Sequence, residues 1–138
     1  MNTQQMLRTH PDVRGNESEP LLRCIDECYA CAQTCISCAD ACVAEQNVSE
    51  LKQCIRLDRD CADLCIATAA LATRRTGSNE EVLRSALEVC ALACRTCAEE
   101  CEKHASMHEH CRICADACRS CERACQEAMA DVGSRQPH

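Results

Sequence analysis

The sequence is almost without large aromatic side chains. It has no Trp and no Phe, and Tyr29 is its only tyrosine. Aromatic rings usually fill much of a protein core, so another group must occupy that volume here. Cysteine and alanine supply most of the 46% apolar fraction. The length of 138 residues is that of one domain.

Two further absences exclude classes of partner. No run approaches the roughly 18 apolar residues that a membrane span needs. Basic residues are interspersed among acidic ones at a net charge of -7, which leaves no basic patch for nucleic acid. Residues 1–20 contain neither an apolar stretch nor a twin-arginine signal. We therefore expect a cytoplasmic protein that binds neither membranes nor nucleic acid.

Cysteine is abundant instead, and most of the 18 cysteines lie three or four residues apart. Residues at this spacing share one side of an α-helix. The inward stripe of each predicted helix is therefore sulfur, suited either to soft metal ions or to cross-linking. The cysteines are Cys24, Cys28, Cys31, Cys35, Cys38, Cys42, Cys54, Cys61, Cys65, Cys90, Cys94, Cys97, Cys101, Cys111, Cys114, Cys118, Cys121 and Cys125.

A secreted disulfide scaffold is the ordinary interpretation of so much cysteine. Two arguments lower its weight. Structural disulfides are rare in a reducing cytosol. Helix neighbours at these spacings also hold their Cβ atoms about 5 to 6 Å apart, whereas a disulfide needs about 3.5 to 4.5 Å. Bonds between helices remain open, but neighbouring thiols on one helix cannot pair.

Helix signals fall between the groups of cysteines. Ser18 before Glu19 and Pro20 is a predicted N-cap. Three capping boxes predict further helix starts. They are Asn47 with Glu50, Ser78 with Glu81, and Ser106 with Glu109. Gly133 and Pro137 are expected to end the last helix.

These signals predict an all-α fold, an antiparallel up-down four-helix bundle with a cysteine-lined core. The four helices are expected near residues 19–44, 48–75, 79–104 and 107–131. We expect a polar N-terminal segment at residues 1–17, in which residues 3–9 can form a short helix. The bundle then occupies residues 18–132, and a tail follows at residues 133–138.

Beyond the cysteines, the two ends of the predicted bundle differ. At one end the stripes continue into apolar or small residues, namely Leu83, Leu87, Thr68, Ala72, Ala128 and Val132. At the other end they reach His104, Met107 and His108, with His110 adjacent. Solvated turn residues would explain these side chains, but their alignment with the stripe favours metal contact. We interpret this end as an entrance for metal.

Asp58 interrupts the sulfur stripe of the second helix, where the spacing of Cys54, Cys61 and Cys65 leads us to expect another cysteine. Three interpretations are open: a weak oxygen ligand, an acceptor for thiol hydrogen bonds, or an edge residue turned to water. An inward carboxylate without a partner is costly. A polar partner is therefore slightly favoured.

Charge balance favours Cu(I) among the metals that thiolates select. Eighteen buried thiolates need compensating charge, and about one monovalent ion per thiolate makes the interior neutral. A straight helical stripe does not wrap an iron–sulfur cluster. Isolated tetrahedral zinc sites leave excess negative charge, although bridged zinc clusters can recover the balance.

Residues 18–131, with their repeated Cys-x-x-x-Cys pairs, resemble the cytosolic branch of the bacterial copper storage proteins. The resemblance implies a homotetramer of four-helix bundles that binds many Cu(I) ions. It also implies that Cys24 through Cys125 are the ligands and that His104, Met107, His108 and His110 form the mouth. No role is transferred to Asp58.

The expected function is therefore cytosolic Cu(I) storage without enzymatic activity, with a copper chaperone as the expected donor. The apo protein should already be helical, because caps and pattern specify its helices. One alternative is a zinc or mixed-metal thiolate buffer. Another is a thiol redox protein, because Cys28/Cys31, Cys35/Cys38 and Cys94/Cys97 are also Cys-x-x-Cys pairs. Those pairs lie mid-helix, away from the helix N-terminus that activates a thiol.

Overall fold

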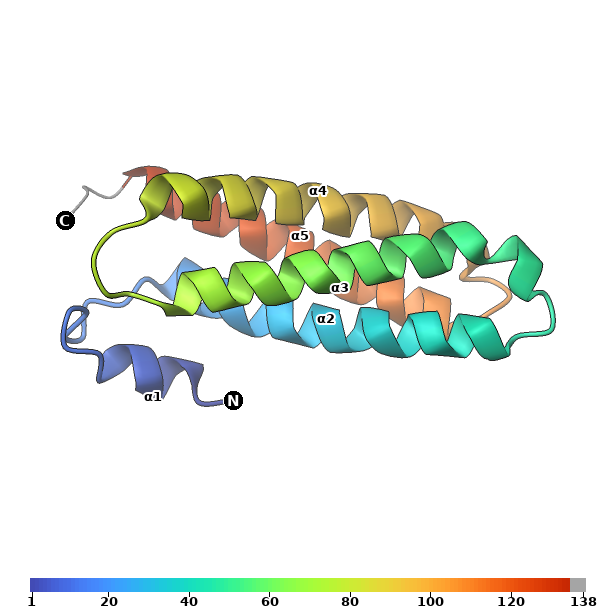
Figure 1. The fold of residues 1–138 in the computed structure, drawn as a ribbon, viewed down its shortest axis with the longest axis horizontal. Coiled ribbons are helices and arrows are strands. Elements are labelled where there is room, and N and C mark those ends of the chain that lie inside the picture. The colour runs from blue at the N-terminus through green and yellow to red at the C-terminus, as the bar shows by residue number, and fades with distance from the viewer. Residues whose placement is uncertain (135–138) are drawn as a thin grey trace.

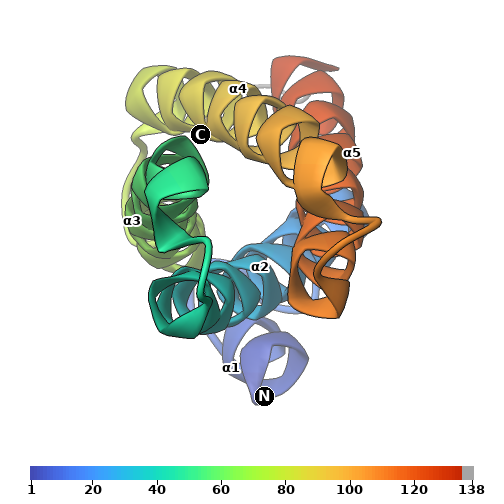
Figure 2. The ribbon, with the colours of Figure 1, turned by 90° about the vertical axis from the view of Figure 1, so that its right-hand side faces the viewer.

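Four long helices form an antiparallel bundle in the computed structural model, which describes residues 1–134 (Figure 1). They are α2 (Glu19–Ala44), α3 (Lys52–Thr73), α4 (Glu80–His104) and α5 (Glu109–Ser134). Each packs against the next in the chain, and α5 packs back against α2, so the helices surround one axis (Figure 2). The predicted all-α bundle is confirmed. No described helix has the length and apolar character to cross a membrane.

Two short elements complete the described chain. Helix α1 (Thr3–Arg8) forms where a short N-terminal helix was expected, and it lies outside the bundle against α2. Leu7 anchors it by burial, and Thr3 Oγ1 donates a hydrogen bond of 2.7 Å to Asp26 Oδ1 on α2. A 3₁₀ turn, η1 (Val48–Glu50), connects α2 to α3.

Ser18 caps α2 as predicted, since its side chain accepts a hydrogen bond from the backbone N–H of Leu21. The bounds expected for this helix, 19–44, match the structure. Pro20 lies in the first turn, where a missing N–H costs nothing.

The capping boxes predicted the first residues of the other three helices less accurately. Asn47 precedes η1 and makes no side-chain cap, so α3 begins at Lys52, four residues later than expected. The residue before α4 is Asn79, not Ser78. Helix α5 begins at Glu109 and leaves Ser106 in the preceding turn. In the expected capping box of Asn47 and Glu50, the Asn47 Nδ2 donates a hydrogen bond to the Glu50 side chain. The two side chains thus bond to each other instead of capping the backbone.

The last helix is longer than predicted. It continues past residue 131 and through Gly133 to Ser134. Residues 135–138 of the expected tail, Pro137 among them, lie outside the described residues.

The core consists of sulfur along most of its length and of hydrocarbon at one end. The apolar end predicted from the stripes is confirmed, because Leu83, Leu87, Ala72, Ala128 and Val132 are all buried there. Thr68 is buried with them, and its hydroxyl donates to the backbone carbonyl of Ala86 at 3.4 Å. The buried side chains named here stabilise the fold by burial of apolar surface, which does not depend on bound metal. We therefore expect this end to stabilise the apo protein.

Candidate metal centre

All eighteen cysteines lie inside the bundle as free thiols, each at most 1% exposed. The three-and-four spacing produces this arrangement, because it repeats once per helical turn and keeps every sulfur on the face that meets the other helices. Stripes from α2, α3, α4 and α5 thus meet along one axis. The inward sulfur stripe predicted from the sequence is confirmed.

The sulfur atoms are in mutual contact within and between helices. Within α2, the Sγ atoms of Cys24 and Cys28 are 3.9 Å apart. Between helices, Cys54 and Cys101 are 3.6 Å apart, and Cys61 and Cys94 are 3.7 Å apart. These distances are well beyond the roughly 2.05 Å of an S–S bond. The thiols form a continuous column and not a set of cross-links.

Groups of four sulfurs within 4.8 Å of one another recur along this column. Several groups share members: Cys31, Cys35, Cys118 and Cys121 each belong to two of them, as bridging thiolates between metal ions require. Examples are Cys28/Cys90/Cys121/Cys125, Cys31/Cys65/Cys94/Cys121, Cys31/Cys35/Cys61/Cys118, Cys35/Cys97/Cys114/Cys118 and Cys38/Cys42/Cys54/Cys111. Such a lattice of soft donors suits many soft ions better than one isolated ion.

Burial controls the charge of the thiols near the histidine end. It raises the pKa of Cys111 to about 12 and raises the pKa of Cys42 as well. Both groups are therefore protonated at neutral pH while no metal is bound. A metal ion that binds there must displace protons, so its apparent affinity weakens as the pH falls.

Asp58 on α3 is fully buried in the sulfur column. Its Oδ1 accepts hydrogen bonds from the thiols of Cys97 at 3.1 Å, Cys114 at 3.2 Å and Cys101 at 3.6 Å. Burial raises its pKa to about 8. The hydrogen-bonding interpretation of Asp58 is confirmed, and the orientation toward water is wrong. Its Oδ2 has no hydrogen-bond partner among the described residues, which leaves an oxygen free inside the column.

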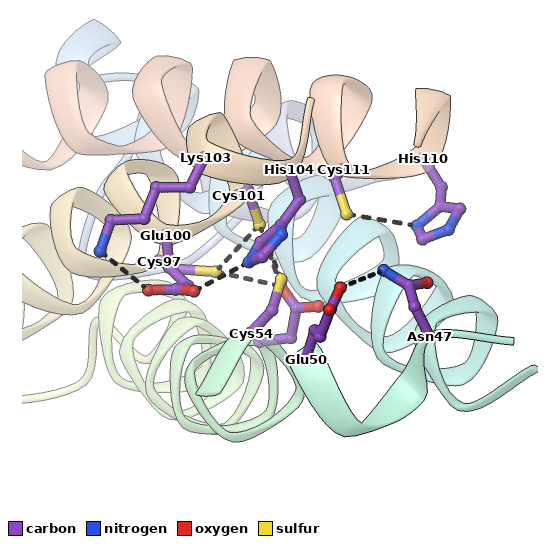
Figure 3. A network of polar contacts seen from close by, with 11 residues as sticks. Asn47, Glu50, Cys54, Cys97, Glu100, Cys101, Lys103, His104, His110 and Cys111 are labelled. Atoms are coloured by element: carbon purple, nitrogen blue, oxygen red, sulfur yellow. Dashed lines mark hydrogen bonds and ion pairs between the residues drawn. The ribbon is translucent and has the colours of Figure 1, made fainter. Parts of the chain in front are cut away.

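The histidine end is built by the α4–α5 connection. His110 Nδ1 accepts from the thiol of Cys38 at 3.4 Å and faces Cys111 at 3.7 Å. Figure 3 shows the ring of His104, one turn after Cys101 on α4, directed at Glu100. The structure thus brings His104 and His110 to the end of the sulfur column, as the stripe predicted.

His108 and Met107 lie differently. His108 stacks on His110, with ring centroids 5.4 Å apart, and its side chain is 10% exposed. Met107 is 69% exposed in the turn. Soft and borderline donors therefore extend from the buried column to the solvent.

Carboxylates at this end were missed by the sequence analysis. His104 Nε2–H donates to Glu100 Oε2 at 3.0 Å, a pairing that the i, i+4 spacing on α4 could have suggested. Glu45 Oε2 accepts from His108 Nδ1–H at 3.0 Å and from His110 Nε2–H at 2.8 Å. The hydrogen bond from His110 lowers the pKa of Glu45. No sequence spacing indicates these contacts, because they join α2 to a connection more than sixty residues away.

Comparison with known proteins finds copper storage proteins. The family described as copper storage protein matches residues 17–130. The copper storage protein Ccsp from Streptomyces lividans, in a structure loaded with 10 copper equivalents, is 54% identical with a TM-score of 0.89. That match covers 93% of this chain and 98% of the other.

Two further solved structures are similar. A structure with five coppers, from work on copper loading to a cytosolic copper storage protein of Streptomyces lividans, is 57% identical over 81% of this chain and 93% of that one, with a TM-score of 0.80. The Cu(I)-bound copper storage protein BsCsp3 is 37% identical over 78% of this chain and 94% of that one, with a TM-score of 0.66. Because the family match spans most of the sequence and includes every cysteine, this chain belongs to the copper storage protein family.

Proposed function

We propose that this protein stores Cu(I) in the cytosol by holding many ions on thiolates inside the four-helix bundle. One observation carries this function: the eighteen thiols form a single buried column of overlapping four-sulfur groups. Relatives that are solved with several coppers, one of them described as cytosolic, support it. The role is storage and not catalysis, as in the rest of the family.

Copper is favoured over zinc because of the shared sulfurs and the charge. Each thiolate between two Cu(I) ions can serve both, and about one monovalent ion per thiolate neutralises the column. Zinc needs four ligands around each ion. A zinc or mixed-metal buffer is therefore the second candidate function.

A thiol redox role is weaker. The Cys-x-x-Cys pairs of α2 and α4 lie mid-helix, away from the helix N-termini that lower thiol pKa values. Cys111 and Cys114 form such a pair near the N-terminus of α5, but burial raises the pKa of Cys111 to about 12, and every thiol is buried.

We assign the eighteen cysteines, Cys24 through Cys125, as the storage ligands. His104, Met107, His108 and His110 are assigned as the mouth. Exposed Met107 and partly buried His110 supply donors of increasing depth, which supports this direction of transfer. In this proposal, residues 18–132 are the storage domain, and residues 1–17 pack on it without holding metal.

Assembly and copper delivery are part of the same proposal. We expect a homotetramer, as the resemblance to the copper storage proteins implies. Ile36 and Val43 on α2 and Ile66 on α3 are each more than 40% exposed and offer apolar surface for self-association. A copper chaperone is the expected donor, since it would deliver Cu(I) to the mouth bound to a carrier.

Anaerobic titration of the reduced protein tests the function. With Cu(I) supplied from a coloured chelator, we expect many ions per monomer to be withdrawn from the chelator, with the helical circular dichroism unchanged. Parallel titration with Zn(II) should fill far fewer sites. Tight binding of a handful of Zn(II) ions and weak binding of Cu(I) would support the buffer instead.

A further inference from the structure

Two of the three histidines at the mouth share a single carboxylate oxygen. Glu45 directly follows α2, and its Oε2 accepts one hydrogen bond from His108 and one from His110. The two imidazoles donate through different nitrogens, Nδ1 in His108 and Nε2 in His110. His104 has a separate acceptor in Glu100, which also pairs with Lys103.

These hydrogen bonds determine which nitrogen of each ring is left bare. A neutral imidazole carries one N–H donor and one lone pair. In His110 the bare nitrogen is Nδ1, which faces the thiols of Cys38 and Cys111. In His108 it is Nε2, which is buried and has no hydrogen-bond partner among the described residues. Each ring therefore presents an unprotonated nitrogen. That of His108 has no partner among the described residues, and that of His110 accepts only a thiol proton, which an incoming metal ion displaces.

We propose that Glu45 is the positioning residue of the copper mouth, holding His108 and His110 in opposite tautomers so that each presents one bare nitrogen to incoming Cu(I). The proposal rests on the storage function and adds a residue outside the thiol, imidazole and thioether ligands. A carboxylate that accepts the second N–H of a ligating histidine orients the ring and makes it more basic.

The transfer that follows needs no oxidant or reductant. Cu(I) held at His110 Nδ1 lies beside Cys38 and Cys111, so a Cu–S bond can form as the thiol proton leaves to buffer. Copper stays monovalent throughout. Without Glu45 both rings can rotate and exchange tautomers, and a protonated nitrogen would face the thiols part of the time.

Glu45→Ala is the test variant, with Glu50→Ala as its matched control. Glu50 lies at the same end of the bundle, but its side chain pairs with Asn47 and not with a histidine. Glu45→Gln keeps an oxygen that can accept both N–H groups, so it should restore most of the function. Circular dichroism of each variant verifies the fold.

The first readout is the tautomer state of the apo protein, measured by ¹⁵N NMR of labelled imidazoles and assigned with single histidine variants. We expect the Nδ1–H form for His108 and the Nε2–H form for His110, with both becoming mixtures in Glu45→Ala only. A mixture already present in the wild-type protein overturns the proposal.

The second readout is the anaerobic rate at which the first Cu(I) equivalents are taken up. Loss of Glu45 should slow this uptake about tenfold or more. The final number of copper ions per monomer should equal that of the wild-type protein, because all eighteen thiols are still present. Glu50→Ala and Glu45→Gln should load at nearly the wild-type rate. An unchanged rate in Glu45→Ala contradicts the role of Glu45, whereas a wild-type protein that takes up no Cu(I) contradicts the storage function itself.

Discussion

The two ends of the bundle share the same sulfur column but close it in opposite ways. At one end Leu83, Leu87 and Val132 seal the column with hydrocarbon. At the other, His104 and His110 meet the last thiols, and their remaining N–H groups are held by carboxylates. The apolar end has packing but no ligands, and the histidine end has ligands but an exposed turn.

This difference separates folding from binding along the axis of the molecule. A thiol is a small hydrophobe that buries less apolar surface than a leucine, so a core of sulfur needs further stabilising packing. The leucines supply it at the apolar end without occupying a ligand position. The histidine end is then free to keep polar groups and solvent access, which a metal entrance needs.

Removal of one four-sulfur group from either end gives the largest expected effect. Cys28, Cys90, Cys121 and Cys125 lie toward the apolar end, and Cys38, Cys42, Cys54 and Cys111 lie toward the histidine end. Replacing either group with serine should lower the copper content by about four ions, at about one per thiolate. Only the histidine-end variant should also slow early uptake, as measured by stopped-flow absorbance. Equal slowing of both variants would contradict a single entrance.

Leu87→Ala tests whether the apolar end carries the stability of the apo protein. Leu87 is fully buried, so its truncation should cost about 2 to 5 kcal/mol in the free energy of unfolding. The control at the opposite end is Met107→Ala, which is mostly exposed and should change stability by at most about 0.5 kcal/mol. Denaturant unfolding of the reduced apo proteins measures both. Similar losses would remove the distinction between the ends.

The stability of the apo protein should depend on pH through Asp58, which lies in the sulfur column between the two ends. Its folded pKa of about 8 exceeds the ordinary 3.8, so between these values the folded state holds a proton that the unfolded state has lost. This contribution is therefore favourable at low pH and is lost as the pH rises. From about pH 5 to about pH 7 it should remove roughly 3 kcal/mol of apo stability.

Asp58→Asn should abolish this part of the slope, because an amide keeps the shape but does not titrate. The measurement is chemical unfolding of wild-type and variant apo protein across the same pH range, under reducing conditions. Parallel slopes for the two proteins would show that the carboxyl of Asp58 is not held protonated in the column.

The smallest expected effect is on the stability contributed by the two helix N-termini at the apolar end. Ser18 caps α2 through its side chain, whereas Asn79 precedes α4 without a side-chain cap. Ser18→Ala should therefore destabilise the apo protein by about 1 kcal/mol, and Asn79→Ala by only a few tenths of that. Thermal or denaturant unfolding measures the pair. A larger loss at Asn79 would contradict the assigned caps.

The bundle could be predicted from the sequence because one signal repeats in every helix. The three-and-four spacing from Cys24 to Cys125 specifies helices, their inward faces and a common core at once. Ser18 added an accurate start for α2. Helix starts at Asn47, Ser78 and Ser106 were misplaced, since a capping box describes a local preference that the turn geometry can override.

The candidate site was predicted in its sulfurs but not in its supporting carboxylates. Asp58 was recognisable because it interrupts a periodic stripe, and its burial among thiols follows from that register. Glu45 was not recognisable, because its contacts with His108 and His110 depend on how the α2 end meets the α4–α5 connection. Contacts between segments distant in sequence require the folded structure.

Anomalous X-ray scattering at the copper edge, from crystals of the anaerobically loaded protein, shows directly whether the thiol column holds the stored copper. We expect a row of copper peaks along the bundle axis, from the level of Cys24 and Cys125 to that of Cys42 and Cys111, each within bonding distance of cysteine sulfur. Copper on the outer surface of the helices, or an axis empty of metal between oxidised cysteines, would contradict it.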